Sequence, residues 1–327
     1  GISPERNIAV ASQSLLYSHN KISSQGVGLA PPVGTRLYTP SATNTNANLD
    51  VFTDVDQLPL ELLDTPVFWH IPKSAGTSIK NIFAQCLGKV IASEVGGLDE
   101  HRLDDTILTV KKPSGLYVNV DTYTIDGINH AKNLGLVQSN VAEVIFTPFL
   151  HETAQLFDTN HRGRLFTILR HPQDRIISLY YFLRMYDSRV KAQTLHQFIT
   201  TSGENWMVRT LTNTMIGAID ETHLNAAKEV LRRKFLIGLL DHKTESFRRF
   251  EEYFGWKIPS PYADKCKNEI FYFQWHVKNP HPNPMEDGQG DGESSTIDAE
   301  IKRMNAWDIA LYEYGCQLFE EQGALFL

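Results

Sequence analysis

Short apolar runs alternate with stretches of helical periodicity along most of the chain. Residues 67–71 form an apolar run rich in β-branched and aromatic side chains, which is typical of a buried strand. In residues 79–87 the apolar positions recur at i, i+3, i+4, i+7 and i+8, which predicts one face of a helix. The same succession is predicted further along, with strands at 143–149, 164–169 and 234–240 and helices at about 151–157, 172–184 and 243–254. This alternation predicts an α/β fold with a mainly parallel central sheet and helices on both faces.

The remaining regions are less regular. Residues 1–57 begin with a long stretch rich in Ser, Asn, Thr, Gly and Pro, and we expect an extended N-terminal arm or stem there, followed by a single domain at 58–327. Strands at 106–110 and 116–125 are expected to form a hairpin or an edge strand. Pro, Gly and acidic residues at about 276–295 predict a mobile surface loop, and a long helix is expected at about 296–322.

The turn at 73–78, between the first strand and the first helix, has the composition of an anion site. Its sequence, Lys-Ser-Ala-Gly-Thr-Ser, places small residues where backbone N–H groups meet the positive end of a helix dipole. Lys73 adds a full charge, and Ser74, Thr77 and Ser78 add hydroxyl donors. The lysine precedes the turn, whereas the nucleotide triphosphate loop requires it after the turn. An ordinary strand–turn–helix junction is the alternative interpretation.

Polar residues also follow two other predicted strands. His151 and Glu152 come after the strand at 143–149, and Arg170 ends the strand at 164–169. Ligands of parallel α/β sheets bind beyond the carboxyl ends of the strands. We therefore expect Lys73, His151, Glu152 and Arg170 to lie along one edge of the sheet.

Composition narrows the classes of partner. The 327 residues are enough for one large domain, and their net charge of −7 with no run of basic residues argues against a nucleic-acid partner. No segment approaches the ~20 apolar residues of a membrane span. Three cysteines (Cys86, Cys266 and Cys316) do not suggest a disulfide framework, and Cys86 and Cys316 are expected in the core. No metal site is expected, since the histidines at 276 and 281 lack a plausible ligand set.

Two motifs resemble the sulfotransferases that use 3′-phosphoadenosine 5′-phosphosulfate (PAPS). The sequence His-Ile-Pro-Lys-Ser-Ala-Gly-Thr-Ser at 70–78 is similar to their 5′-phosphosulfate loop, most of all in the Golgi carbohydrate branch that includes the heparan sulfate 2-O-sulfotransferases. The sequence Arg-His-Pro-Gln-Asp-Arg-Ile-Ile-Ser-Leu-Tyr at 170–180 resembles their 3′-phosphate signature. The resemblance implies a P-loop-like three-layer α/β/α fold with PAPS as donor and PAP as product. The residues implied at the donor are Lys73, Ser74, Ala75, Gly76, Thr77, Ser78, Arg170 and Ser178.

Two further segments extend the resemblance. Residues 205–211 are similar to a family segment that makes Arg209 a candidate second anion contact, and residues 305–312 resemble the closing helix, whose role we expect to be structural. Within the 3′-phosphate motif, Arg175 is either part of the site or a surface charge.

The general base is the least certain element of the sequence. Relatives commonly carry a Gly-His pair where this chain has Thr147-Pro148. His151 is the first candidate, because a histidine of near-neutral pKa is a natural base. Glu152 is the second, and His70 the third, since its side chain could face the site or orient the turn.

The sequence therefore predicts a sulfotransferase that moves a sulfuryl group from PAPS to a hydroxyl of a carbohydrate or small-molecule acceptor. The alternative is a non-catalytic relative that binds PAP or PAPS and has lost its base. A kinase using ATP is disfavoured, because ATP has no 3′-phosphate for Arg170 and Ser178. The compartment is open between the Golgi lumen, by resemblance, and the cytoplasm.

Overall fold

The computed structural model describes residues 49–57, 64–97, 101, 104–258, 266 and 293–326. Residues 1–48 of the predicted arm and 276–292 of the predicted loop lie outside the described residues. The end of the predicted arm belongs to the folded domain, because Phe52 is fully buried and forms a β-bridge with Gly163. Leu49 and Phe52, at the end of the predicted arm, thus pack in the main hydrophobic core.

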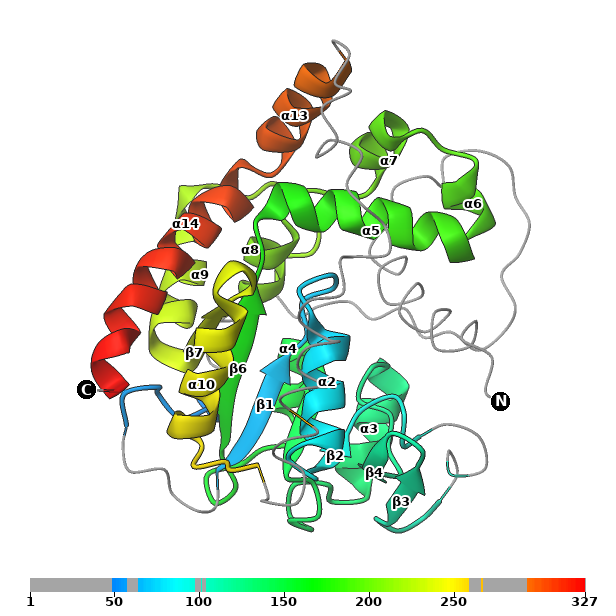
Figure 1. The fold of residues 1–327 in the computed structure, drawn as a ribbon, viewed down its shortest axis with the longest axis vertical. Helices are drawn as coiled ribbons and strands as arrows, with labels where there is room; N and C mark the ends of the chain where they lie inside the picture. Colours follow the sequence, from blue (N-terminus) through cyan, green and yellow to red (C-terminus); the bar gives the residue numbers. More distant parts are fainter. Residues whose placement is uncertain are drawn as a thin grey trace.

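Seven strands form one central sheet in the order β3-β4-β2-β5-β1-β6-β7 (Figure 1). All neighbouring strands pair in parallel except the antiparallel β3–β4 hairpin at one edge. This confirms the predicted mainly parallel α/β fold. The strands are β1 (Thr65–Trp69), β2 (Val90–Ala92), β3 (Thr109–Lys112), β4 (Gly115–Val118), β5 (Val144–Thr147), β6 (Gly163–Leu169) and β7 (Phe235–Leu239).

Helices cover both faces of the sheet and its carboxyl edge. Two helices, α2 and α10, pack on one face through an aromatic cluster centred on Phe83 and Phe166. Helices α3, α4, α8, α9 and α14 share the other cluster with Trp69. Helix α5 packs with α6, α7 and α13 in a third cluster, beyond the carboxyl ends of the strands in Figure 1. The bounds are α2 (Gly76–Gln85), α3 (Ile125–Asn133), α4 (Leu150–Ala154), α5 (Pro172–Tyr186), α6 (Ser188–Lys191), α7 (Leu195–Thr201), α8 (Trp206–Leu211), α9 (Glu221–Lys234), α10 (Lys243–Tyr253), α13 (Glu293–Met304) and α14 (Ala306–Glu321).

The segment 89–142 differs most from its prediction. Strand β2 and helix α3 were not predicted, because β2 has only three residues and α3 buries only Ile128 and Ala131. The predicted hairpin exists, but its strands are shorter and lie at 109–112 and 115–118. Helix α3 begins where the Thr124 side chain accepts a hydrogen bond from the N–H of Gly127.

The predicted C-terminal helix is two helices, α13 and α14, separated at Asn305. The Asn305 side chain accepts from the N–H of Asn205, and Asn205 Oδ1 accepts from the N–H groups of Trp307 and Asp308. The carboxylate of Asp308, which is fully buried, accepts from two N–H groups at the start of α8. These bonds compensate the break, and they confirm the structural role expected for residues 305–312.

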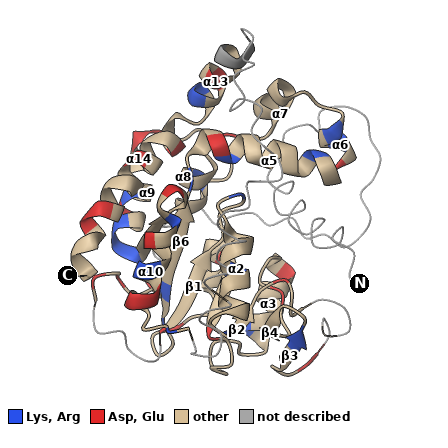
Figure 2. Ribbon diagram, in the orientation of Figure 1, with Lys and Arg blue, Asp and Glu red and all other residues tan. Residues whose placement is uncertain are grey.

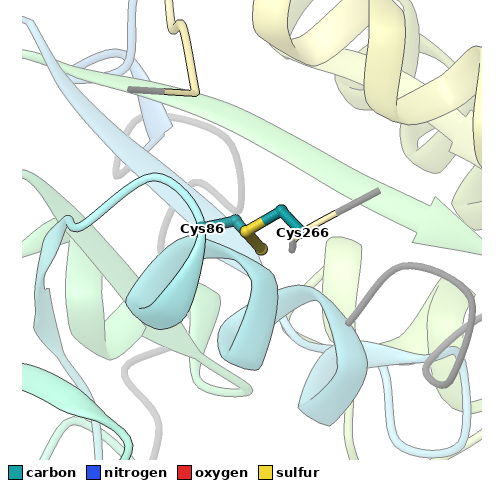
Figure 3. Close-up of a disulfide and its surroundings, with 2 residues drawn as sticks. All are labelled: Cys86 and Cys266. Atoms are coloured by element: carbon teal, nitrogen blue, oxygen red, sulfur yellow. A yellow bond between two sulfur atoms is a disulfide. The ribbon is translucent and has the colours of Figure 1, made fainter. Parts of the chain in front are cut away.

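A disulfide joins Cys86, at the end of α2, to Cys266 (Figure 3). The two cysteines are 180 residues apart in the sequence, and their Cα atoms are 5.6 Å apart. Cys86 is buried, as predicted, and the single disulfide was not predicted, because the fold brings distant segments together. Cys316 is free.

No helix of the described residues combines the length and the apolar composition needed to cross a bilayer.

Candidate active site

The turn between β1 and α2 has the backbone shape of an anion site. Lys73 and Ala75 both adopt left-handed conformations, with φ of 69° and 61°. For residues other than glycine, each costs on the order of 1–3 kcal/mol, and such strain concentrates at functional sites. Helix α2 begins directly after Ala75 with no side-chain cap, so its first N–H groups lack an intrahelical acceptor. The positive end of α2 therefore presents backbone donors, as the sequence predicted.

Ser74 lies within this turn and provides a test of fit for a phosphate or sulfate group. The residue is 1% exposed, and its Oγ has no hydrogen-bond partner within the described part of the chain. A buried hydroxyl without a partner is costly, so it marks a place where an external group is expected to bind. An anionic oxygen is the acceptor that this hydroxyl and the N–H groups of α2 share.

The ammonium of Lys73 lies over the ring of Phe182 in α5, with Nζ 4.2 Å from the ring centroid. Burial, and then the nearby charge of Arg170, together lower the pKa of Lys73 to about 8. A lysine in this environment gains from a negatively charged ligand, which would restore its charged form.

The two predicted phosphate motifs meet at the carboxyl ends of β1 and β6. These strands pair in parallel, and Arg170 follows β6 directly. Arg170 donates a hydrogen bond of 3.0 Å from Nη1 to the main-chain carbonyl of Lys73. Ser178 lies on α5, one helical turn before Phe182, and is 6% exposed. The structure thus brings Lys73 and Arg170 into direct contact and places Ser178 on the helix that carries the lysine's aromatic partner.

His70 orients the turn. One ring nitrogen, Nδ1, is hydrogen-bonded to the hydroxyl of Tyr123, 2.5 Å away. The other side of the ring packs on Gly76, where an added Cβ would lie 2.0 Å from His70 Cδ2. Burial, and then the charges of Lys80 and Lys73, lower the pKa of His70 to about 3. A histidine with so low a pKa is a weak base, and of the two roles predicted for His70 the structure favours the orientation of the turn.

His151, the first candidate for the base, is buried in α4 and bonded to α8 through one ring nitrogen. It is 6% exposed in α4, and its Nε2 lies 2.9 Å from the carbonyl oxygen of Thr210 in α8, to which it donates. Burial lowers its pKa. This bond depends on a partner 59 residues away, so no local pattern could have predicted it.

Glu152, the second candidate, is half-buried beside it. Burial raises the pKa of its carboxyl group, which makes it a stronger base than an exposed glutamate. No ion pair involves Glu152 in the segments that the structure describes. Of the three candidates, Glu152 is the one whose pKa is shifted by burial toward neutrality.

The structure gives specific partners to two arginines named from the sequence, Arg209 and Arg175. Arg209 binds the segment 204–217, because its guanidinium donates to the carbonyls of Glu204, Thr214 and Gly217 and to the Glu204 carboxylate. The structure thus gives it a structural task in place of the expected anion contact. Arg175 is 3% exposed and lies over the ring of Trp206, which excludes the interpretation as a surface charge.

The fold and the two motifs agree with a comparison to protein families. A model of the sulfotransferase family matches residues 65–254, more than half of the chain. The chain belongs to the sulfotransferase family. The match contains β1, the Lys73 turn, β6 and the Arg170–Ser178 motif, so the described site lies within the matched region.

Comparisons with individual proteins are less informative than the family match. Among curated proteins, no sequence matches this one significantly. Among solved structures, the chain is similar to the crystal structure of mouse sulfotransferase SULT7A1 complexed with PAP, at a TM-score of 0.41 and 11% identity. That alignment covers 82% of this chain and 92% of the mouse chain.

Proposed function

We propose that this member of the sulfotransferase family transfers a sulfuryl group from PAPS to a hydroxyl of a carbohydrate or small-molecule acceptor. The observation that supports this most is the contact between Arg170 and the main chain of Lys73. It joins two anion motifs into one site, and PAPS carries anionic groups at the 5′ and the 3′ positions of its ribose. ATP has no 3′-phosphate to occupy the second motif.

Different residues of this chain bind the two anionic ends of the donor. Ser74, Thr77, Ser78 and the N–H groups at Ala75 and Gly76 hold the 5′-phosphate and the sulfate. Arg170 and Ser178 hold the 3′-phosphate, the arginine through its planar fork.

Charge and proton movements assign the remaining roles. During transfer the bond from sulfur to the bridging oxygen breaks and a bond to the acceptor oxygen forms. Lys73 stabilises the negative charge that develops on the leaving phosphate. Glu152 accepts the proton of the acceptor hydroxyl.

A second function, binding of PAP or PAPS without turnover, rests on the neighbourhood of Thr147. This residue occupies the position of the Gly-His pair of relatives, is fully buried, and accepts hydrogen bonds from the N–H of Phe149 and the hydroxyl of Thr153. His151, the nearest histidine in the sequence, is bonded through Nε2 to the carbonyl of Thr210. Loss of catalysis with retained binding would follow if Glu152 does not replace it.

One assay separates these functions. The protein is incubated with sulfur-labelled PAPS and a panel of carbohydrate and small-molecule acceptors, and labelled product is measured beside the thermal shifts caused by PAP and by ATP. A sulfotransferase gives labelled product that Lys73→Ala abolishes, and a larger shift with PAP than with ATP. Binding without product from any acceptor supports the second function, and a larger shift with ATP contradicts both.

The disulfide and the surface charges bear on the compartment and on the class of partner. The Cys86–Cys266 disulfide supports an oxidising compartment such as the Golgi lumen over the cytoplasm. Figure 2 shows basic and acidic residues interspersed along α9 and α10, and ion pairs such as Arg248–Glu245 neutralise them locally. A surface of this kind lacks the basic stripe that binds nucleic acid.

A further inference from the structure

A buried polar cluster lies beside the Lys73 turn, on the side of β2 and α3. It consists of His70, Tyr123, Lys80 and Glu94, which come from four separate segments of the sequence. Lys80 forms an ion pair with Glu94, and its ammonium lies 5.1 Å from the centre of the Tyr123 ring. His70 is the first residue of the 70–78 motif, whereas Lys80, Glu94 and Tyr123 lie outside both phosphate motifs.

The hydrogen bond between His70 and Tyr123 has a preferred direction. Burial raises the pKa of the Tyr123 phenol well above 10, so the phenol keeps its proton. Among the described residues, His70 Nδ1 is the one hydrogen-bond partner of this hydroxyl. If Nδ1 donated instead, the hydroxyl hydrogen would have no acceptor in a buried site. We therefore assign Tyr123 as the donor, which leaves the imidazole neutral with its proton on Nε2.

The imidazole in turn contacts the first residue of α2. A Cβ at Gly76 would lie 2.0 Å from His70 Cδ2 and 2.1 Å from Nε2, so the ring fills the space above this glycine. The backbone N–H of His70 also bonds to the carbonyl of Thr147 at the end of β5. Three contacts therefore fix His70: its main-chain bond to β5, its hydrogen bond to Tyr123 and the packing of its ring on Gly76.

The turn that this ring supports needs such a support. Lys73 and Ala75 are held in strained left-handed conformations, and Ala75 gives α2 no side-chain cap. Strained backbone persists only where the surroundings hold it in place. If the His70 ring rotated away, the first turn of α2 would lose the group that packs against it.

We propose that Tyr123 is a positioning residue, which, through His70 and Gly76, holds the Lys73–Ala75 turn in the shape that binds the 5′-phosphate of the donor. This inference rests on the proposed function, because it assumes that the turn binds that group. The Lys80–Glu94 ion pair holds the Lys80 ammonium over the Tyr123 ring.

The test compares two ligands that differ only in the group concerned. PAP carries the 5′-phosphate and adenosine 3′-phosphate lacks it, so their affinity ratio measures what the turn contributes. The variant is Tyr123→Phe, which removes one hydroxyl and keeps the ring. The control is Tyr117→Phe, because Tyr117 is equally buried and loses only a bond to Ser114. Binding is measured by calorimetry on the full chain.

We expect Tyr123→Phe to weaken PAP binding about tenfold, as for one buried hydrogen bond whose partner is left unsatisfied. Its affinity for adenosine 3′-phosphate should change less than twofold, and Tyr117→Phe should leave the ratio at its wild-type value. A merely structural role of Tyr123 would weaken both ligands alike. A wild-type ratio in Tyr123→Phe overturns the inference.

A second variant tests the contact between the His70 ring and Gly76. Gly76→Ala displaces the His70 ring, and it should lower the ratio of PAP affinity to adenosine 3′-phosphate affinity. The double variant with Tyr123→Phe should show no further loss, because both changes disrupt the same interaction. Fully additive losses contradict the inference, even if one single variant is poorly folded. If the wild-type protein does not bind PAP at all, the proposed function fails first, and the role of Tyr123 at the donor fails with it.

Discussion

Arg170 Nη1 bonds to the carbonyl oxygen of Lys73, and this single contact connects residues 97 positions apart in the sequence. Because the guanidinium fixes the backbone of the lysine, a ligand that orders Arg170 also orders the turn that follows Lys73. The two ends of the donor are then bound by one connected unit.

Removal of one hydroxyl from this unit should affect only one end of the donor. We expect Ser178→Ala to weaken PAP binding about fivefold to tenfold, the usual effect of a lost hydrogen bond to a charged group. Affinity for adenosine 5′-phosphate, which lacks the 3′-phosphate, should not change. Equal losses for both nucleotides would show that Ser178 does not contact the 3′-phosphate. Calorimetry with the two nucleotides makes the comparison.

Protonation of Lys73 should be coupled to donor binding. Its pKa is about 8 in the protein without ligand, because burial and Arg170 disfavour the charged form. A bound anion favours that form, so the protein should take up protons when PAP binds between about pH 8 and pH 9. Calorimetry in buffers of different ionisation enthalpy measures this uptake.

The matched control for this prediction is Lys73→Arg, since arginine stays protonated throughout the range. Uptake should vanish in this variant, and kcat/KM for PAPS in the wild type should fall above about pH 8. Uptake that persists in Lys73→Arg would assign the proton to another group.

The identity of the base can be tested by comparing neighbouring residues. Glu152→Gln should lower kcat about 10²-fold or more, as for the loss of a general base, with PAP affinity unchanged. His151→Leu should lower the melting temperature, because the carbonyl of Thr210 loses one of its donors, but turnover of the folded protein should stay within a few-fold of wild type. The opposite result, with His151 essential and Glu152 dispensable, would restore the original ranking of the two.

The disulfide should contribute to stability. Cys86→Ser should lower the free energy of unfolding by about 2–5 kcal/mol, the usual effect of losing a native disulfide. Denaturant titration with and without reductant measures this difference. Cys316→Ser is the control, because this cysteine is free, and it should not change the response to reductant. A wild-type protein that is unaffected by reductant would contradict the contribution.

The features that the sequence predicted correctly depend on local order. The strand, turn and helix at 65–85 are specified by an apolar run, a small-residue turn and a helical repeat, all within about 20 residues. The site at Lys73 and Arg170 could be expected because both follow predicted parallel strands, and the strands proved to be neighbours.

The features that were missed depend on distant partners. The bond of His151 to the carbonyl of Thr210 in α8 forms only when α8 packs against α4. The bond of Arg209 to the carbonyl of Gly217 depends on the turn that follows α8. Tyr123 could not be recognised because its partner, His70, lies 53 residues earlier. The Cys86–Cys266 pair spans 180 residues, and nothing in cysteine spacing alone indicates it.

The hydrogen bonds of Asp308 have a practical consequence for shortened forms of this protein. The family match ends at residue 254, yet Asp308 caps the start of α8, and Gln322 bonds with both Phe235 and Ile237 of β7. A truncation at the end of the recognised region would strip these backbone groups of their partners and uncover the apolar surface beneath α14. For expression or crystallisation, the minimal unit therefore extends to about residue 326.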